Sequence, residues 1–172
     1  KDVGGEDIDI YIGIPFCISR CKYCSFISRD LTFNETIKDQ YLPRLFYELD
    51  ALKEVMDQYR IRALYIGGGT PTTLSAPELD RLLADTKACF DLSACREFTV
   101  EAGRPDTVTE EKLAVLVSHG VNRVSVNPQT MSDAVLEEIG RHHTAAQVRE
   151  AVAMVKKFPQ LAFNICLLYT SD

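Results

Sequence analysis

The segment IPFCISRCKYCSF, residues 14–26, places three cysteines within eight positions, directly after an apolar strand-like run. Cys17, Cys21 and Cys24 are separated by three and then by two residues. Three thiolates on one short loop can hold three corners of a cubane iron–sulfur cluster, which leaves the fourth iron open to a small molecule. The segment therefore predicts a reactive metal site at the end of a β-strand.

Structural zinc, a disulfide and inert buried thiols are the alternative explanations of this triplet. Structural zinc needs four ligands, usually as two separated pairs, and no Cys or His follows closely behind Cys24. Ferredoxin-type loops supply a fourth cysteine, which this loop lacks. We favour the open cluster, and we interpret Cys89 and Cys95 as small buried or loop hydrophobes.

The composition indicates one globular unit that can bury a core. The 172 residues are 46% hydrophobic and 26% charged, and the formal net charge of -6 argues against a nucleic-acid surface. No apolar run is long enough to span a membrane, and the acidic start KDVGGEDIDI does not resemble a signal peptide. We expect a cytoplasmic, reducing compartment, and a chain that is truncated at both ends.

Strand-like and helical patterns alternate along the chain, which predicts an α/β fold with parallel strands, as an open sheet or a partial barrel. The predicted strands are 8–14, 62–68, 97–102, 122–127 and 161–168. The predicted helices are 34–59, 76–89, 109–118, 132–139 and 145–157. Helix caps are expected at Ser75, Thr109, Ser132 and Thr144, and Pro43 is expected to kink or divide the first helix.

Four of the five strands run into a proline-containing loop, so the strand ends are well marked. These prolines are Pro15, Pro71, Pro105 and Pro128. Ligands of β/α folds bind at the carboxyl ends of the strands. We therefore expect the cysteine loop, the glycine loop 67–69 and the loop after Glu101 to converge on a single site.

Strand periodicity separates a polar face from an apolar one. The polar face carries Tyr11, Gly13, Thr99, Glu101, Ser125, Asn127 and Gln129. The apolar face carries Ile10, Ile12, Ile14, Phe98, Val100, Val124 and Val126, which are expected to pack against the helices. A bound polar ligand would satisfy the polar face; hydrogen bonds among these groups, or buried water, are the alternative.

The glycine loop, Gly67 to Gly69 followed by Thr70, allows close backbone approach and is expected to present N–H groups to a carboxylate. An ordinary turn is the alternative. The loop lacks both the spaced glycines of a dinucleotide fingerprint and the lysine of a phosphate loop.

Five further side chains can be interpreted from their positions. Glu101 is a candidate ligand-binding carboxylate or half of a buried salt bridge, and Arg141 could neutralise a ligand carboxylate or sit on a charged helix end. His142 and His143 are interpreted as surface or capping residues. His119 precedes Gly120 at a helix end and is given no catalytic role.

The motifs YIGIPFC and IGGGTPT around the cysteine loop resemble the radical S-adenosylmethionine (radical SAM) superfamily. EFTVEAGRPDT, VNRVSVNPQTM and IGRHHT resemble its oxygen-independent coproporphyrinogen III oxidase family, and most of all the coproporphyrinogen dehydrogenase-like branch. The resemblance covers nearly the whole chain. It implies a partial (β/α)6 barrel with about five β/α units, as one core domain over residues 1–172. Residues 166–172, CLLYTSD, look foreign to the family.

The resemblance also implies a ligand set. Cys17, Cys21 and Cys24 match the ligands of a 4Fe-4S cluster, whose open iron would bind S-adenosylmethionine. The positions that match cofactor contacts are Tyr11, Tyr23, Gly68, Gly69, Thr70, Glu101, Gln129 and Arg141. The resemblance implies that a 5′-deoxyadenosyl radical abstracts hydrogen from the substrate; no catalytic side chain is assigned.

For an oxidase of this family, the substrate would be coproporphyrinogen III, whose propionates lose carbon dioxide to become the vinyl groups of protoporphyrinogen IX in haem biosynthesis. The implied partners are this porphyrinogen and a reductant such as flavodoxin or ferredoxin. Three departures limit what the resemblance implies. Gly13 stands where many relatives carry a histidine, and Cys166 stands where an aspartate that contacts the cofactor is expected. Phe26 stands where the better-known oxidases carry a further cysteine, which weakens the case for decarboxylation. The alternative is a non-oxidising haem-binding chaperone with the same core.

Overall fold

The computed structural model describes residues 6–26, 28–31 and 35–168. Its main sheet has five parallel strands: β1 (Asp7–Ile14), β4 (Arg60–Gly68), β5 (Glu97–Ala102), β6 (Arg123–Gln129) and β7 (Ala162–Leu167). All five predicted strands are confirmed within two residues at either end. Two short strands, β2 (Phe16–Cys17) and β3 (Arg29–Asp30), form a separate pair. Residues 169–172 of the predicted foreign tail, and residue 34 of the first predicted helix, lie outside the described residues.

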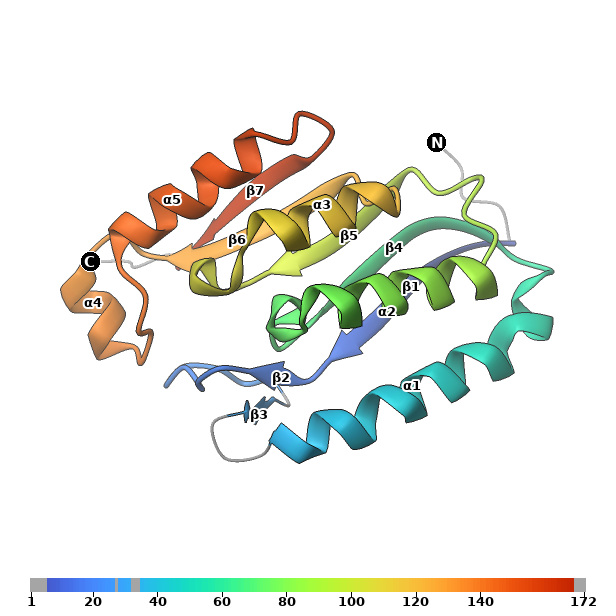
Figure 1. Ribbon diagram of the computed structural model, residues 1–172, viewed down its shortest axis with the longest axis horizontal. Helices are drawn as coiled ribbons and strands as arrows, with labels where there is room; N and C mark the ends of the chain where they lie inside the picture. Colours follow the sequence, from blue (N-terminus) through green and yellow to red (C-terminus); the bar gives the residue numbers. More distant parts are fainter. Residues whose placement is uncertain (1–5, 27, 32–34, 169–172) are drawn as a thin grey trace.

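The strand order is β1-β4-β5-β6-β7, so each strand lies beside the next one in the chain. A doubly wound sheet would reverse this order and place helices on both faces. Without a reversal among the described strands, right-handed crossovers bring every connecting helix to the same face. Figure 1 shows α1, α2, α3 and α5 as one layer over the sheet. The fold is the predicted α/β fold, in its partial-barrel form.

The helices begin where the sequence predicted. They are α1 (Glu35–Met56), α2 (Ala76–Cys89), α3 (Glu110–Ser118), α4 (Asp133–Glu138) and α5 (Ala145–Lys156). The predicted caps are confirmed, because the side chains of Ser75, Thr109, Ser132 and Thr144 each accept a hydrogen bond from a backbone N–H of the first turn. Pro43 does not divide α1, which is continuous. No helix of the described residues is long and apolar enough to cross a membrane.

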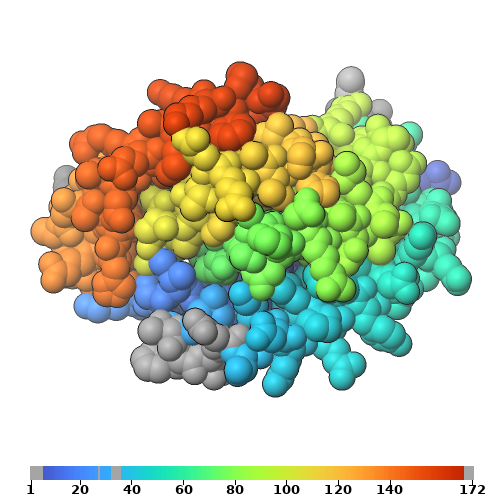
Figure 2. All heavy atoms as spheres, in the orientation of Figure 1, coloured from blue at the N-terminus to red at the C-terminus, as the bar shows by residue number. Residues whose placement is uncertain are grey.

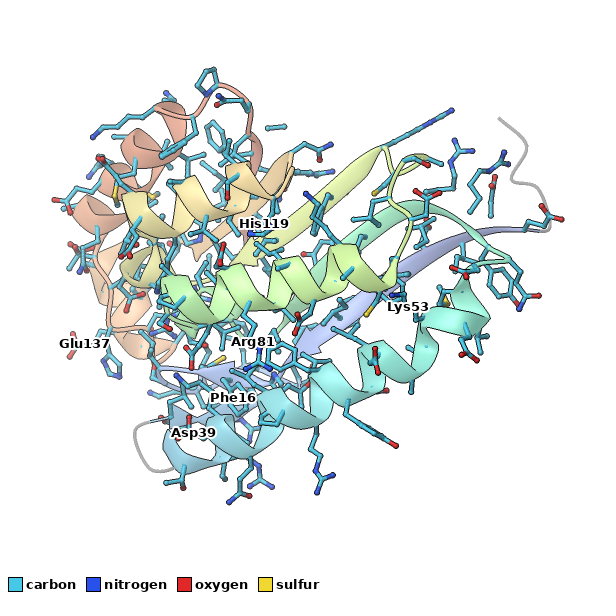
Figure 3. All side chains as sticks on the ribbon, turned by 45° about the vertical axis from the view of Figure 1, so that its right-hand side comes forward. Phe16, Asp39, Lys53, Arg81, His119 and Glu137 are labelled. Atoms are coloured by element: carbon cyan, nitrogen blue, oxygen red, sulfur yellow. The ribbon has the colours of Figure 1, made fainter. Side chains whose placement is uncertain are left out.

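The apolar strand face packs against the helices, as predicted. Ile14, Leu64, Val100 and Val124 are fully buried there. Contacts between helices close the layer: the guanidinium of Arg81 lies 4.3 Å from the centre of the Phe46 ring. His119, at the end of α3, pairs with Asp80 of α2, which agrees with a structural role (Figure 3).

The opposite face of the sheet is polar, and its side chains bond to one another. Ser125 Oγ donates to Asn127 Oδ1 at 2.8 Å, and Asn127 Nδ2 donates to Glu101 Oε1 at 2.8 Å. Asn164 Nδ2 donates to Ser125 Oγ. Internal hydrogen bonds, the alternative considered from the sequence, therefore satisfy much of this face. The Glu101 carboxylate also accepts a hydrogen bond from the backbone of Gly68.

Short 3-10 turns follow two of the strands, at η2 (Pro71–Thr73) and η3 (Pro105–Thr107). Each turn has a proline at its first position, and this proline follows the last residue of the strand by three positions: Pro71 after Gly68, and Pro105 after Ala102. Both turns lie at the carboxyl edge of the sheet, near the pair β2 and β3. The predicted convergence of the cysteine loop, the glycine loop and the loop after Glu101 is confirmed, since one pocket contains residues of all three. Pro128, which was expected to end its strand, lies within β6 instead.

Candidate functional site

The cysteine loop, residues 17–24, lies between β2 and β3. Contacts on both sides of the loop hold it in place. Phe16 is fully buried, and its ring meets the ring of Tyr41 edge-on, with 5.3 Å between centroids. Figure 3 shows Phe16 beside α1. Arg29 N donates to Pro15 O at 2.7 Å, which closes the loop. A buried aromatic anchor and a closing hydrogen bond therefore fix where the thiols emerge.

A third attachment comes from the segment after α4. Lys22 N donates to Ile139 O at 3.0 Å, and Gly140 packs against the backbone of Arg20 and Lys22. In Figure 2 the blue segment that carries the cysteines meets the orange residues around α4. Parts of the chain more than a hundred residues apart thus build one wall of the site.

The glycine loop binds the cysteine segment rather than presenting free N–H groups. Gly69 N donates to Ile14 O at 2.9 Å, and Thr70 N donates to Phe16 O at 2.7 Å. A Cβ on Gly69 would stand 2.6 Å from Phe16 O, so only glycine fits there. The predicted close approach is present, but its partner is the chain itself. The expectation that these two N–H groups face a ligand carboxylate is wrong, because strand-end backbone already uses them.

One pocket at this edge gathers nearly all of the predicted site residues. Its lining includes Cys17, Cys21, Cys24, Tyr23, Gly68, Gly69, Thr70, Glu101, Gln129 and Arg141. Tyr11 is the exception among the described residues: it is 59% exposed and stacks on Tyr65, with 5.8 Å between the rings. The structure thus brings together side chains from the cysteine loop and from the ends of β4, β5 and β6.

The three cysteines are free thiols. Within the described residues, no three His, Cys, Asp or Glu side chains stand close enough to hold a single metal ion. A cubane asks for something different, because each of its thiolates binds a separate iron. Three free thiols that line one pocket fit that requirement. Burial raises the pKa of the Cys17 thiol, while the Thr70 hydroxyl, 3.5 Å from Cys17 Sγ, and the Arg104 guanidinium oppose this shift.

Glu101 lies near the carboxyl end of β5 and faces the pocket. Burial raises the pKa of its carboxyl group, and the hydrogen bonds from Asn127 and from the backbone of Gly68 partly offset the shift. A cation placed here would favour the ionised form. The carboxylate is therefore suited to accept a hydrogen bond from a positively charged or hydroxyl-bearing ligand.

Arg141 is buried and joins three segments of the pocket wall. Its Nη1 donates to Gly103 O at 2.9 Å and also to Asn127 O, and its Nε donates to the Tyr23 hydroxyl at 3.2 Å. Burial raises the pKa of Tyr23 to about 12, so the phenol stays protonated. Arg141 does follow the end of α4, where its backbone N donates to Leu136 O at 2.8 Å. Its side chain is nevertheless buried at the pocket, since only 7% of the residue is exposed.

Gln129 ends β6 with a backbone φ of 73°, in the left-handed region. Among the described residues it is the one non-glycine with a positive φ. This conformation costs free energy for an L-residue, and such strain clusters at ligand sites. Gln129 is buried at the pocket and its carbonyl accepts from Leu168 N, so surrounding contacts hold it there.

Sequence reasoning missed Arg104 and misplaced His143. Both are 2% exposed. His143 was interpreted as a surface or capping residue, which is wrong: it is buried behind the pocket, 4.0 Å from Asp106, while its neighbour His142 is exposed as expected. Arg104 lines the pocket and contacts a cysteine. A charged residue between Gly103 and Pro105, just after a strand, was the signal that could have found it.

The fold and site define a class: a partial β/α barrel with a three-cysteine pocket at the carboxyl edge of its sheet. A family model described as the Radical SAM superfamily matches residues 11–170. The chain belongs to the radical SAM superfamily and, within it, to the HemN-, HemZ- and HemW-like group of the oxygen-independent coproporphyrinogen III oxidase family.

Similar proteins fall into two functional groups. The chain is 39% identical to the oxygen-independent coproporphyrinogen-III oxidase-like protein HemZ of Bacillus subtilis, over 95% of this chain and 33% of that protein. It is 40% identical to the heme chaperone HemW of Lactococcus lactis, over 92% of this chain and 40% of that protein. The chain thus spans about a third to two fifths of the relatives it matches.

A solved structure has a closely similar fold. It is the coproporphyrinogen III oxidase HemN from Escherichia coli, described as a radical SAM enzyme. The TM-score is 0.84 at 25% sequence identity, with 94% of this chain and 37% of that chain covered. The likeness confirms the predicted fold class, a parallel five-strand part of a radical SAM barrel.

Proposed function

We propose that this chain holds a 4Fe-4S cluster through Cys17, Cys21 and Cys24, and that S-adenosylmethionine binds at the iron they leave open. The observation that carries the proposal is the convergence of three free thiols with polar groups from three strand ends on one pocket. When bound, a reduced cluster and this cofactor supply a 5′-deoxyadenosyl radical that removes a hydrogen atom from a substrate.

The side chains of the pocket would orient the cofactor and keep water away. Glu101 would accept a hydrogen bond from its ammonium or ribose hydroxyl, and Arg141 would offer positive charge to its carboxylate. Arg141 can do so only from the pocket wall, because its hydrogen bonds to Gly103 O and Asn127 O fix it there. Gly68, Gly69, Thr70, Tyr23 and Gln129 would complete the cofactor pocket, with Tyr11 at its rim.

We propose as substrate a porphyrinogen, and as reaction the oxidative decarboxylation of coproporphyrinogen III propionates to vinyl groups. For each propionate, the 5′-deoxyadenosyl radical would take one hydrogen atom, carbon dioxide would leave, and the remaining electron would pass to a one-electron acceptor. The support is similarity to the HemZ and HemN proteins named above. The proposal includes an electron donor such as flavodoxin or ferredoxin and a reducing cytoplasmic compartment, since a reduced cluster is required. The radical chemistry assigns the bond-breaking step to the cofactor, so we assign no acid–base residue in this chain.

Haem binding without oxidation is the second candidate. It is favoured by the equally high identity to a HemW heme chaperone, and by Phe26, which stands where the oxidases carry a further cysteine. Both candidates use the same cluster pocket. They differ in whether the substrate is consumed.

Anaerobic reconstitution with iron and sulfide, followed by electron paramagnetic resonance of the reduced protein, tests the cluster. We expect a 4Fe-4S signal whose shape changes when S-adenosylmethionine is added, because the cofactor binds the open iron. A signal that ignores the cofactor would reject the open-iron site. The absence of any cluster after reconstitution would reject the whole proposal.

A second experiment separates the two candidates. The reconstituted protein, a low-potential reductant and S-adenosylmethionine are incubated anaerobically with coproporphyrinogen III, and the products are separated by chromatography. Vinyl-containing porphyrin and 5′-deoxyadenosine are expected of the oxidase. Stoichiometric haem binding with no porphyrinogen consumed would instead favour the chaperone.

A further inference from the structure

Arg104 is a buried cation at the cysteine pocket that the cofactor assignment does not use. It follows β5 and is 2% exposed. Its Nη1 donates to Cys21 Sγ at 3.5 Å, and its Nη2 donates to Ser19 Oγ at 2.8 Å. Both acceptors lie on the cysteine loop, more than eighty residues away in sequence. The two terminal nitrogens of the Arg104 guanidinium therefore bind the cysteine loop at Ser19 and at the thiol of Cys21.

Hydrogen bonds hold the backbone of Arg104, and one carboxylate forms an ion pair with its guanidinium without a hydrogen bond from Nε. Its carbonyl accepts hydrogen bonds from the N–H of Thr107, at 3.0 Å, and from the Thr107 hydroxyl, at 2.7 Å. Its Nε lies 3.6 Å from Asp106 Oδ1. Burying a long charged side chain costs both solvation and rotamer freedom, so such a residue is kept only where its contacts offset that cost.

The charge around the pocket is unbalanced toward positive. Among the described lining residues there are three arginines, Arg20, Arg104 and Arg141, but Glu101 is the one carboxylate. Burial lowers the pKa of His143, which lies beside Asp106, so this ring is neutral near pH 7 and Asp106 remains a partner for Arg104. Asp106 offsets part of the charge of Arg104 but accepts no hydrogen bond from Nη1, so this N–H and the remaining positive charge still face Cys21 Sγ.

We propose that Arg104 is a positioning residue that orients the Cys21 thiolate and raises the reduction potential of the cluster bound there. The inference rests on the proposed function, because it concerns the same cluster. Reduction adds one negative charge to a cluster that three thiolates already make electron-rich. A cation and an N–H donor at a ligand sulfur stabilise the reduced form more than the oxidised form, which makes reduction easier.

A redox titration of the anaerobically reconstituted chain, followed by electron paramagnetic resonance, measures this effect. In Arg104→Gln, which keeps a donor amide but loses the charge and the second terminal nitrogen, we expect the equilibrium constant for reduction to fall about tenfold. For a one-electron couple, a tenfold change corresponds to about 59 mV toward lower potential. Arg104→Lys keeps the charge but cannot reach Ser19 and Cys21 together, so it should shift in the same direction by less.

Arg20→Gln is the matched control. Arg20 also lines the pocket and lies on the same loop, but it is exposed, so solvent screens its charge. Removal of the Arg20 charge should change the equilibrium constant for reduction of the cluster less than about threefold. A potential for Arg104→Gln that equals that of Arg20→Gln would overturn the inference, since general charge would then explain any shift.

Ser19→Ala provides the test if Arg104→Gln does not form a cluster on reconstitution. This variant leaves both the charge and the three cysteines in place and removes the Ser19 anchor of the guanidinium. A potential below that of the unchanged protein supports the inference, and an unchanged potential overturns it. If the unchanged protein itself forms no cluster, the proposed function has failed. If the unchanged protein forms a cluster whose reduction potential is the same in Arg104→Gln and Ser19→Ala, only the proposed role of Arg104 has failed.

Discussion

The helix-facing side of the sheet and its carboxyl edge are both buried, yet they are built on different principles. On the helix side, fully buried aliphatic side chains such as Leu82 and Val100 contact one another without direction. At the carboxyl edge, buried Arg104 and Arg141 are held by individual hydrogen bonds that they donate to distant loops. The core therefore tolerates change gradually, whereas the edge depends on single contacts. Substitutions that separate stability from ligand binding test this contrast.

Loss of one thiol should have the largest effect on the site and almost none on the core. Cys21→Ala should abolish the reconstituted cluster, because two thiolates cannot hold it. Iron and sulfide analysis and the absorbance of the cluster measure this. The thermal unfolding of the protein without metal should remain unchanged.

Cys89→Ala is the matched control, since it removes a thiol from the core instead of from the pocket. Cys89 is buried at the end of α2, away from the pocket. Its truncation should lower the free energy of unfolding by about 1 kcal/mol and leave the iron content of the folded protein intact. An undiminished iron content in Cys21→Ala would contradict the assignment of the ligands.

Truncation in the core should have the reverse result. Leu82→Ala removes a fully buried side chain from α2 and should cost about 2–5 kcal/mol of unfolding free energy, through lost burial and the cavity left behind. Urea unfolding measures the loss. The cluster content per folded molecule should not change. A proportional loss of cluster in the folded fraction would show that core and edge are coupled more tightly than their contacts indicate.

Glu101 connects the two kinds of surface, since it is largely buried and polar. Glu101→Gln should weaken S-adenosylmethionine binding about tenfold or more while it spares the cluster, because a hydrogen bond to a charged group contributes about 1.5–3 kcal/mol. Calorimetric titration of the reconstituted protein measures the affinity. Loss of the cluster as well would indicate that Glu101 acts in folding instead.

The stability of the metal-free protein should respond to pH through the same residue. Burial raises the folded-state pKa of Glu101 above its ordinary value of 4.5. The folded chain therefore holds this proton more tightly than the unfolded chain, and the resulting stability is complete below about pH 4.5 and is lost as pH rises through the folded pKa. Glu101→Gln should remove this part of the pH dependence. Parallel unfolding curves for both proteins from pH 4.5 to 8 would contradict it.

The extent of sequence-based prediction follows the same contrast. Strands, helices and caps could be predicted because they depend on local periodicity and on single residues such as Ser75 and Thr144. That the three cysteines share one pocket could be predicted because their spacing is local. The place of Arg104 just after a strand was a local signal, but its contact with Cys21 could not be predicted, since that contact spans 83 positions of the chain. The hydrogen bond from Gly69 N to Ile14 O could not be predicted either, because it depends on how the ends of β1 and β4 lie beside each other.

Backbone strain gives the smallest and most specific test. Gln129, at the pocket, and Gly120, in the turn before β6, both have a positive φ, of 73° and 84°. A Cβ at Gly120 would meet nothing within 4 Å, so Gly120→Ala isolates the cost of the conformation and should destabilise the protein by about 1 kcal/mol.

Gln129→Gly is the converse change and removes the strain at the site. We expect the free energy of unfolding to stay equal or to rise by up to about 1 kcal/mol, even though a buried side chain is lost, while cofactor affinity falls. Urea unfolding and calorimetric titration measure the two effects. A marked loss of stability would mean that the Gln129 side chain supports the fold. A gain in stability with a loss of affinity would instead show that the carboxyl edge holds a strained backbone for the sake of binding, which the turn at Gly120 avoids by using glycine.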